Sequence, residues 1–124
     1  MEPDVTATDK TTAERVARNE DEFRRANERI TAAADEMDQD FGPLPVICEC
    51  PQLDCTEIAR ATIAEYQEVR ASGRTFLVVP GHEVTVVEGL TIARLRKKFE
   101  GFSLMEKVGE TGEIAEELDP RSDG

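Results

Sequence analysis

Residues 48–55 read Cys-Glu-Cys-Pro-Gln-Leu-Asp-Cys and hold all three cysteines of this 124-residue chain. The only histidine, His82, follows a Pro80-Gly81 turn signal. Three thiols and one imidazole form a complete ligand set for a tetrahedral Zn²⁺ ion. We therefore predict one structural zinc site with four ligands, Cys48, Cys50, Cys55 and His82.

The spacing of this motif is unusual, because a familiar zinc knuckle has two residues between its paired cysteines and here only Glu49 stands between them. In an extended strand, residues i and i+2 point to the same side, so both thiols are able to face one ion. Asp54 and Glu83 are candidates to orient the imidazole or to replace a ligand. The competing interpretation is that the cysteines are small core residues, His82 is a turn histidine, and no metal binds.

The composition indicates a small core that gains from a metal. The chain has five Phe, one Tyr and no Trp, and structural zinc contributes on the order of 10 kcal/mol to the folding of small modules. The sequence has no apolar run near the length of a membrane span, and its N-terminus lacks the features of a signal peptide. We therefore expect a cytoplasmic protein with no membrane partner, in a compartment where thiols stay reduced.

The formal net charge of −12 argues against nucleic acid as a partner. One basic cluster between residues 88 and 108 consists of Arg94, Arg96, Lys97, Lys98 and Lys107. We interpret it as a solvated helix face, with a docking site for an acidic partner as the alternative. The acidic runs Glu20-Asp21-Glu22 and Glu116-Glu117 are likewise expected to be solvated helix faces.

Three regions are expected along the chain: a disordered acidic tail at 1–10, a single zinc-binding domain at 11–108, and an acidic C-terminal tail at 109–124 with a short helix that is either frayed or docked. Large apolar residues recur every seven positions in the first helix, with alanines between them, at Val16, Phe23, Ile30, Met37, Ala26 and Ala33. This stripe predicts packing on the protein's own sheet. A monomer is therefore expected, and a homodimer through the same helix, with Asn19 setting its register, is the alternative.

A hairpin is expected from residues 44–47 and 55–60, with Ile58 pointing inward. A helix is expected at 63–71, where Thr62 and Glu65 have the spacing of a capping box. The remaining expected elements are a strand at 75–79, a helix at 91–99 and a strand at 102–108. Together they predict an α+β fold. The long N-terminal helix packs on a small, mostly antiparallel sheet of three or four strands, and zinc closes the edge of that sheet.

The function expected from these features is a non-catalytic protein-interaction or regulatory module that binds another protein. One alternative is a thiol-based redox sensor or cysteine enzyme, with Cys50 or Cys55 as nucleophile and His82 as base. Another is an acidic mimic of nucleic acid that occupies a basic groove on another protein.

The sequence also resembles a group of small uncharacterised proteins from high-GC Gram-positive bacteria over most of residues 14–121. The resemblance depends on Arg18-Asn19-x3-Phe23-Arg24-x2-Asn27-Glu28-x-Ile30, the cysteine cluster, Glu65-Tyr66-x2-Val69-Arg70, Pro80-Gly81-His82-Glu83 and Glu106-Lys107. It implies no particular activity and no functional residues beyond the suspected Cys and His ligands.

Overall fold

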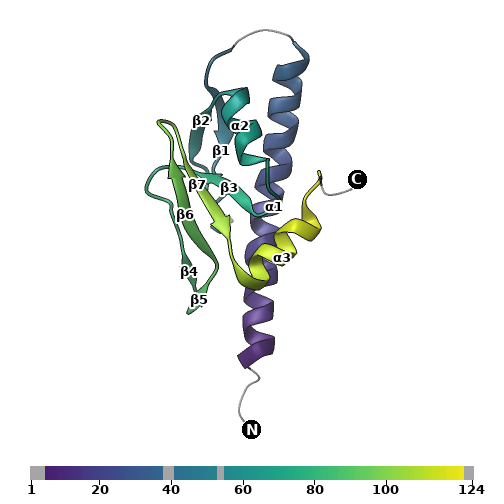
Figure 1. The fold of residues 1–124 in the computed structure, drawn as a ribbon, viewed down its shortest axis with the longest axis vertical. Helices are drawn as coiled ribbons and strands as arrows, with labels where there is room; N and C mark the ends of the chain where they lie inside the picture. The colour runs from purple at the N-terminus through teal and green to yellow at the C-terminus, as the bar shows by residue number, and fades with distance from the viewer. Residues whose placement is uncertain (1–4, 38–40, 53–54, 122–124) are drawn as a thin grey trace.

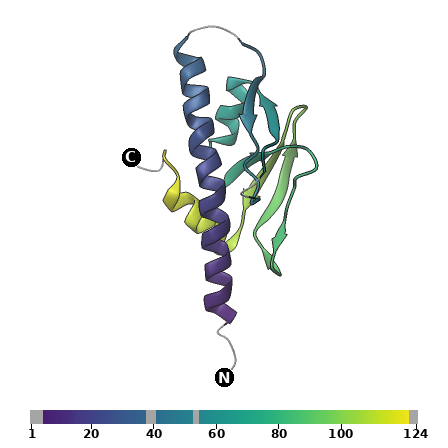
Figure 2. The same ribbon diagram turned by 180° about the vertical axis from the view of Figure 1, so that it is seen from behind.

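The computed structural model describes residues 5–37, 41–52 and 55–121 and has an α+β fold. A long helix, α1 (Val5–Glu36), runs the length of the molecule beside small antiparallel sheets (Figures 1 and 2). The remaining elements are β1 (Leu44–Ile47), β2 (Ile58–Ala61), α2 (Ile63–Val69), β3 (Thr75–Val78), β4 (Val86–Val87), β5 (Leu90–Thr91), β6 (Ala93–Lys98), β7 (Ser103–Lys107) and α3 (Gly109–Leu118). No helix in the described part of the chain has the length and apolar character needed to cross a membrane.

Helix α1 begins at Val5, so the expected disorder of residues 1–10 is wrong for residues 5–10, while residues 1–4 lie outside the described part of the chain. The physical reason is that the sequence from Val5 to Glu36 contains no glycine or proline, so nothing interrupts the helix. The chain turns back through Gly42, whose φ of +64° suits glycine, before β1 begins.

The strands form three small antiparallel sheets. The pair β1–β2 is the predicted hairpin, with Ile47 opposite Ile58 at its cysteine end. The order β3-β7-β6 makes a three-stranded sheet, and β4–β5 is a two-residue hairpin. The sequence therefore predicted the fold class, whereas the strands divide into more sheets than expected.

The prediction of a helix at 91–99 is wrong, because this segment forms the edge strand β6. Its residues pair with β7 from Ala93 opposite Lys107 to Lys98 opposite Ser103, with a register shift between Leu95 and Lys97. Basic side chains suit either element locally, so pairing with the next strand, β7, decided the outcome. Four of the five basic residues thus lie on β6, where Arg94 meets Glu106 at 2.6 Å and Lys97 meets Glu68 at 3.1 Å. The fifth, Lys107, lies on β7 and is buried, so it is not part of a solvated face.

Helix α2 has the predicted capping box. The Thr62 hydroxyl accepts from the backbone N–H of Glu65 at 3.1 Å, and the Glu65 carboxylate accepts from the N–H of Thr62 at 2.8 Å. Tyr66 and Val69 are buried as expected. In the neighbouring strand β2 the inward residues are Ala59 and Ala61, so the predicted inward position of Ile58 is wrong and its side chain is half exposed.

The face of α1 that packs on the sheets combines apolar and polar residues, which corrects part of the predicted packing of the apolar stripe. Val16 of the stripe is buried as predicted, but Glu20, Arg24 and Asn27 are also fully buried there, whereas Met37 is 64 % exposed. The prediction that residues 20–22 form a solvated face is wrong for Glu20 and Asp21, because both are buried. Buried polar groups are stable only when they are paired, and here they find partners on other elements.

Helix α3 is docked rather than frayed. It lies against α1 and follows directly from β7 (Figure 1). The Arg24 guanidinium donates to the carbonyl oxygens of Gly73 and Ala115, at 2.9 Å each, and stacks 4.6 Å from the Phe76 ring centre. Arg24 therefore ties α1 to α3 and to the segment before β3.

Candidate metal site

The four predicted ligands come together from two parts of the chain that are close to one another only in the fold. Cys48 and Cys50 follow β1, and Cys55 precedes β2, so hairpin pairing brings the two ends of the cysteine segment back together. His82 comes from the turn after β3. The backbone joins the two parts where the N–H of Glu49 donates to the carbonyl oxygen of Leu77 at 2.9 Å.

The ligand atoms of these four residues all lie within 4.8 Å of one another. Nδ1 of His82 is 3.6 Å from the Cys48 sulfur and 3.7 Å from the Cys55 sulfur. All three cysteines are free thiols, with Cys48 and Cys50 buried and Cys55 partly exposed. The predicted set is therefore complete, and the group could hold a metal ion.

Backbone N–H groups surround the sulfurs. The N–H of Val79 donates to the Cys48 sulfur at 3.2 Å, and the N–H of Cys50 also faces it. Gln52 and Glu57, each two residues after a cysteine, direct their N–H groups at the sulfurs of Cys50 and Cys55. Such donors stabilise negative charge on sulfur, so the local backbone favours thiolates.

The thiols perturb one another because they are so close. The hydrogen bond with Cys48 lowers the pKa of Cys50 to about 5. The same hydrogen bond, together with burial, raises the pKa of Cys48, and burial raises the pKa of Cys55. One thiolate forms easily, and three at this spacing need a cation among them to balance their charge.

The turn that presents His82 is held by its own contacts. Gly81 has a φ of +99°, and the N–H of His82 donates to the carbonyl oxygen of Val79 at 2.9 Å. The Glu83 carboxylate accepts from the N–H of Gly81 at 2.8 Å and from the Ser103 hydroxyl at 2.7 Å. Glu83 thus fixes the turn rather than the imidazole, and the other candidate, Asp54, lies outside the described residues.

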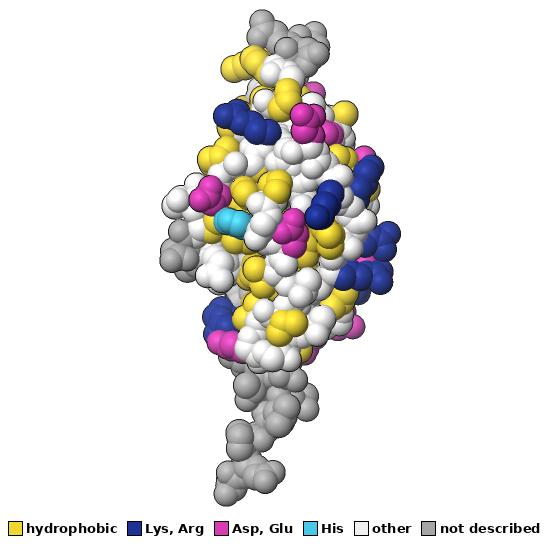
Figure 3. Space-filling model, turned by 90° about the vertical axis from the view of Figure 1, so that its left-hand side faces the viewer, with side chains coloured by type: hydrophobic (Ala, Val, Ile, Leu, Met, Phe, Trp, Pro, Cys, Tyr) yellow, Lys and Arg dark blue, Asp and Glu magenta, His cyan; other side chains and the backbone are white. Residues whose placement is uncertain are grey.

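The histidine lies on the surface of the sheet side of the molecule. In Figure 3 the cyan side chain of the chain's single histidine is visible among hydrophobic side chains on that face. Cys48 and Cys50 are fully buried, whereas Cys55 and His82 are partly exposed, so solvent reaches the site at these two residues.

Two buried residues behind the cysteines were missed by the sequence reasoning. The Glu49 carboxylate accepts from the N–H of Leu77 at 3.0 Å and from the Asn27 amide at 2.8 Å, and burial raises its pKa to about 7. Asn27 also exchanges two hydrogen bonds with the backbone of Ile47, at 2.7 and 2.8 Å. Strand alternation was the available signal, because Glu49 must point away from two inward cysteines.

These contacts connect the metal site to α1. Asn27 holds the end of β1, and Glu49 joins that end to β3. Comparison of the chain with family models, curated proteins and solved structures found no match, so its function has to be argued from this site.

Proposed function

We propose that Cys48, Cys50, Cys55 and His82 bind one Zn²⁺ ion and that the ion is structural. The observation that carries the proposal is the spacing of the ligand atoms. A tetrahedral zinc ion with Zn–S of about 2.3 Å and Zn–N of about 2.0–2.1 Å sets its sulfur and nitrogen ligands about 3.5–3.6 Å apart. The two sulfur to Nδ1 distances of 3.6 and 3.7 Å agree with that value.

The donor chemistry supports zinc over the common alkaline-earth cations. Thiolate and imidazole are soft or borderline ligands, whereas Ca²⁺ and Mg²⁺ prefer oxygen. Sulfur ligands around a tetrahedral zinc ion lie about 3.8 Å apart. The ligand atoms of this site are up to 4.8 Å apart, so the most widely separated of them must approach one another by about 1 Å when the ion binds. Cys55, which is partly exposed next to a turn, is the ligand with most freedom to make that adjustment.

A four-ligand site favours a structural role because it leaves no coordination position for a substrate. The ion would fasten the β1–β2 hairpin to the turn after β3, and so hold two of the three sheets together. One cavity, of about 610 Å³, is lined by Pro43, Arg60, Thr62, Glu65, Glu100 and Gly101 and contains none of the four ligands. We therefore propose a metal-stabilised, non-catalytic module that acts by binding another protein.

Elemental analysis of the dialysed protein tests the metal. We expect about one zinc per chain, and a clear loss of zinc in Cys55→Ser and His82→Asn. Thr56→Ser is the matched control, because it changes an exposed neighbour of Cys55 that is not a proposed ligand. Less than about half a zinc per wild-type chain would remove the proposal.

A second function is supported by the same thiols. The pKa of the buried Cys50 is lowered to about 5, and its neighbour Cys55 is partly exposed, so a thiol-based redox sensor would combine the thiolate of one with the access of the other. The rate of alkylation of the metal-loaded protein at neutral pH separates the two. Slow labelling of all three cysteines supports a structural site, and rapid labelling of one cysteine supports the redox function.

A further inference from the structure

An apolar groove lies between the C-terminal end of α1 and the start of β1. Its lining residues are all apolar: Ile30, Ala33, Ala34, Met37, Phe41 and Leu44. Met37 is 64 % exposed and Phe41 is 43 % exposed. Large side chains with this exposure on one concave surface are typical of an interaction site.

The spacing on the helix side of the groove indicates that a helix fills it. Ala26, Ile30, Ala33 and Met37 follow one another at intervals of four, three and four residues, which is the seam of a helix pair. The two alanines allow a second helix to approach closely. This seam lies beside the face of α1 that packs on the sheets; Ala33 and Met37 are exposed, and Ala26 and Ile30 are half-buried.

Two charges on the solvent side of the seam identify the partner. Arg29 and Glu36 are exposed, and neither has an ion-pair or hydrogen-bond partner within the described part of the chain. The helix offers them no partner of opposite charge, because residues 32 and 33, one turn from both, are alanines. They are seven residues apart, so both project from the same side of α1.

A second copy of α1, running antiparallel, satisfies the seam and the charges together. With the two-fold axis between residues 31 and 32, Ile30 faces Ala33 of the second copy and Ala26 faces Met37 of the second copy. In the same register Arg29 faces Glu36 of the second copy, and symmetry repeats the pair. A parallel arrangement does not pair these two charges, because it sets equal positions side by side.

We propose that this groove is the interface of a homodimer in which the C-terminal halves of two α1 helices cross antiparallel. The contact does not extend along the whole helix. Toward the N-terminus the β4–β5 hairpin covers α1, where Val16 is buried and Glu88 bonds Thr12 at 3.0 Å and Arg15 at 2.9 Å. An interface of three helical turns is small, so the dimer is reversible.

Sedimentation velocity of the full-length, metal-loaded protein over a range of concentrations tests the dimer. We expect a reversible monomer–dimer equilibrium in the wild type. Met37→Glu abolishes the dimer without loss of fold, because Met37 faces solvent in the monomer and contributes little to its core.

Charge reversal tests the antiparallel register. Arg29→Glu alone and Glu36→Arg alone each raise the dimer dissociation constant about tenfold or more, because each replaces two attractive pairs with two repulsive ones. The double variant Arg29→Glu/Glu36→Arg restores dissociation to near the wild-type value. Arg18→Glu makes the same charge change about three helical turns N-terminal to Arg29, outside the proposed contact. It is the control and leaves association unchanged.

Three results overturn the proposal: a wild-type protein that stays monomeric at every concentration, a dimer that survives Met37→Glu, or single reversals that weaken the dimer without rescue by the double variant. The metal test above is independent, because none of the residues changed here is a ligand or contacts one.

Discussion

Lys107 and Glu20 bring opposite charges into the interior where α1 crosses β7. Both side chains are almost fully buried and form a direct ion pair. Burial raises the pKa of Glu20 to about 7 although the ammonium of Lys107 opposes that shift, and one carboxylate oxygen of Glu20 has no partner in the described part of the chain. Desolvation therefore outweighs the attraction, and the pair contributes little net stability while each member depends on the other.

This dependence gives a prediction for the single residues. Lys107→Met leaves the Glu20 carboxylate buried without a counter-charge and lowers the free energy of unfolding by about 3–5 kcal/mol. The double variant Glu20→Met/Lys107→Met removes both charges, so its free energy of unfolding is within about 1 kcal/mol of the wild-type value or higher than it. Urea denaturation of the metal-loaded proteins measures both. Equal losses in the single and double variants would contradict the argument.

The metal ligands were predictable from the sequence, whereas the residues that hold the ligand-bearing segments in place were not. Three cysteines and one histidine stand out because the chain contains no others. Asn27 and Glu49 look like ordinary surface residues of a helix and a hairpin. Only the tertiary fold shows that Asn27 bonds the backbone of Ile47 and that Glu49 bonds Leu77.

Among the elements, those with strong local signals were predicted best. The capping box located α2, and the apolar run at residues 75–79 located β3. Strand β6 was missed because its stability comes from pairing with β7, which local propensity does not report. The inward face of α1 was only partly predicted, because Glu20, Arg24 and Asn27 are buried beside Val16 and hydrophobic periodicity locates only apolar residues.

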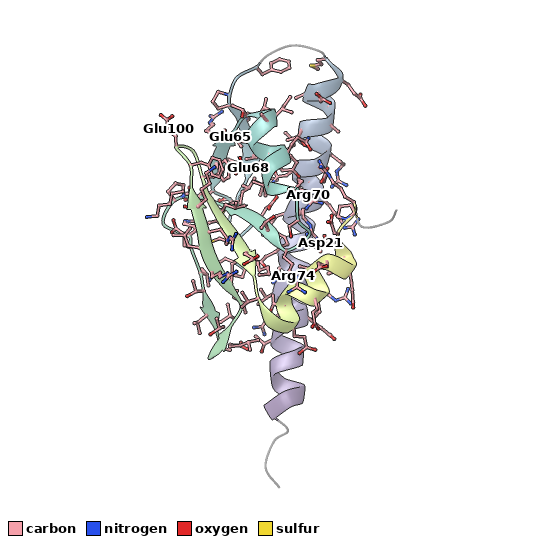
Figure 4. The ribbon with its side chains drawn as sticks, viewed as in Figure 1. Asp21, Glu65, Glu68, Arg70, Arg74 and Glu100 are labelled. Carbon is pink, nitrogen blue, oxygen red and sulfur yellow. The ribbon has the colours of Figure 1, made fainter. Side chains whose placement is uncertain are left out.

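The contact between the β6–β7 hairpin and β2 gives a prediction for these elements. The N–H of Arg60 donates to the carbonyl oxygen of Gly101 at 3.2 Å, and a Cβ at residue 101 would overlap the carbonyl oxygen of Arg60. Gly101→Ala therefore pushes the hairpin away from β2 and costs about 2–3 kcal/mol of stability. Glu100, at the tip of that hairpin, points outward in Figure 4, so the hairpin has room to move.

Hydrogen exchange distinguishes this displacement from a general loss of stability. We expect faster exchange of the Arg60 N–H in Gly101→Ala than the change in global stability explains. Gly89→Ala is the control, because Gly89 has a φ of +80° and no neighbour within 4 Å of an added Cβ. Gly89→Ala lowers the free energy of unfolding by about 1–2 kcal/mol through backbone strain. In this variant the Arg60 N–H exchanges no faster than that loss of global stability explains. Identical exchange patterns in the two variants would refute the close contact.

Over the whole molecule, one ion-pair network joins α1 to the ends of α2 and α3. Arg121, beyond α3, bonds the Glu28 carboxylate at 2.7 and 3.1 Å, and Arg70 at the end of α2 bonds Glu28 and Asp119. In Figure 4 Arg70 lies on the side of the molecule where α1 meets α3. The network holds the ends of α2 and α3 against α1 at Glu28, on the C-terminal side of the contacts that Glu88 makes at Thr12 and Arg15.

The network predicts how stability changes in acid. Burial raises the pKa of Glu28, but the hydrogen bonds from Arg121 and Arg70 outweigh it and hold the pKa below the usual 4.5. The folded state therefore binds the proton more weakly than the unfolded chain does. The stability that the Glu28 carboxylate contributes is thus fully present above pH 4.5 and is lost as the pH falls through the folded pKa.

Glu28→Gln should lower the free energy of unfolding by about 1–2 kcal/mol at neutral pH. The difference in this free energy between the variant and wild type should narrow below about pH 4. Urea denaturation of both proteins as a function of pH measures the gap, and loss of metal in acid affects both alike. Glu22→Gln, at an exposed carboxylate with no ion pair to the described residues, is the control with no gap at either pH. A gap for Glu28→Gln that stays constant down to pH 3 would mean that the carboxylate contributes through packing rather than through its charge.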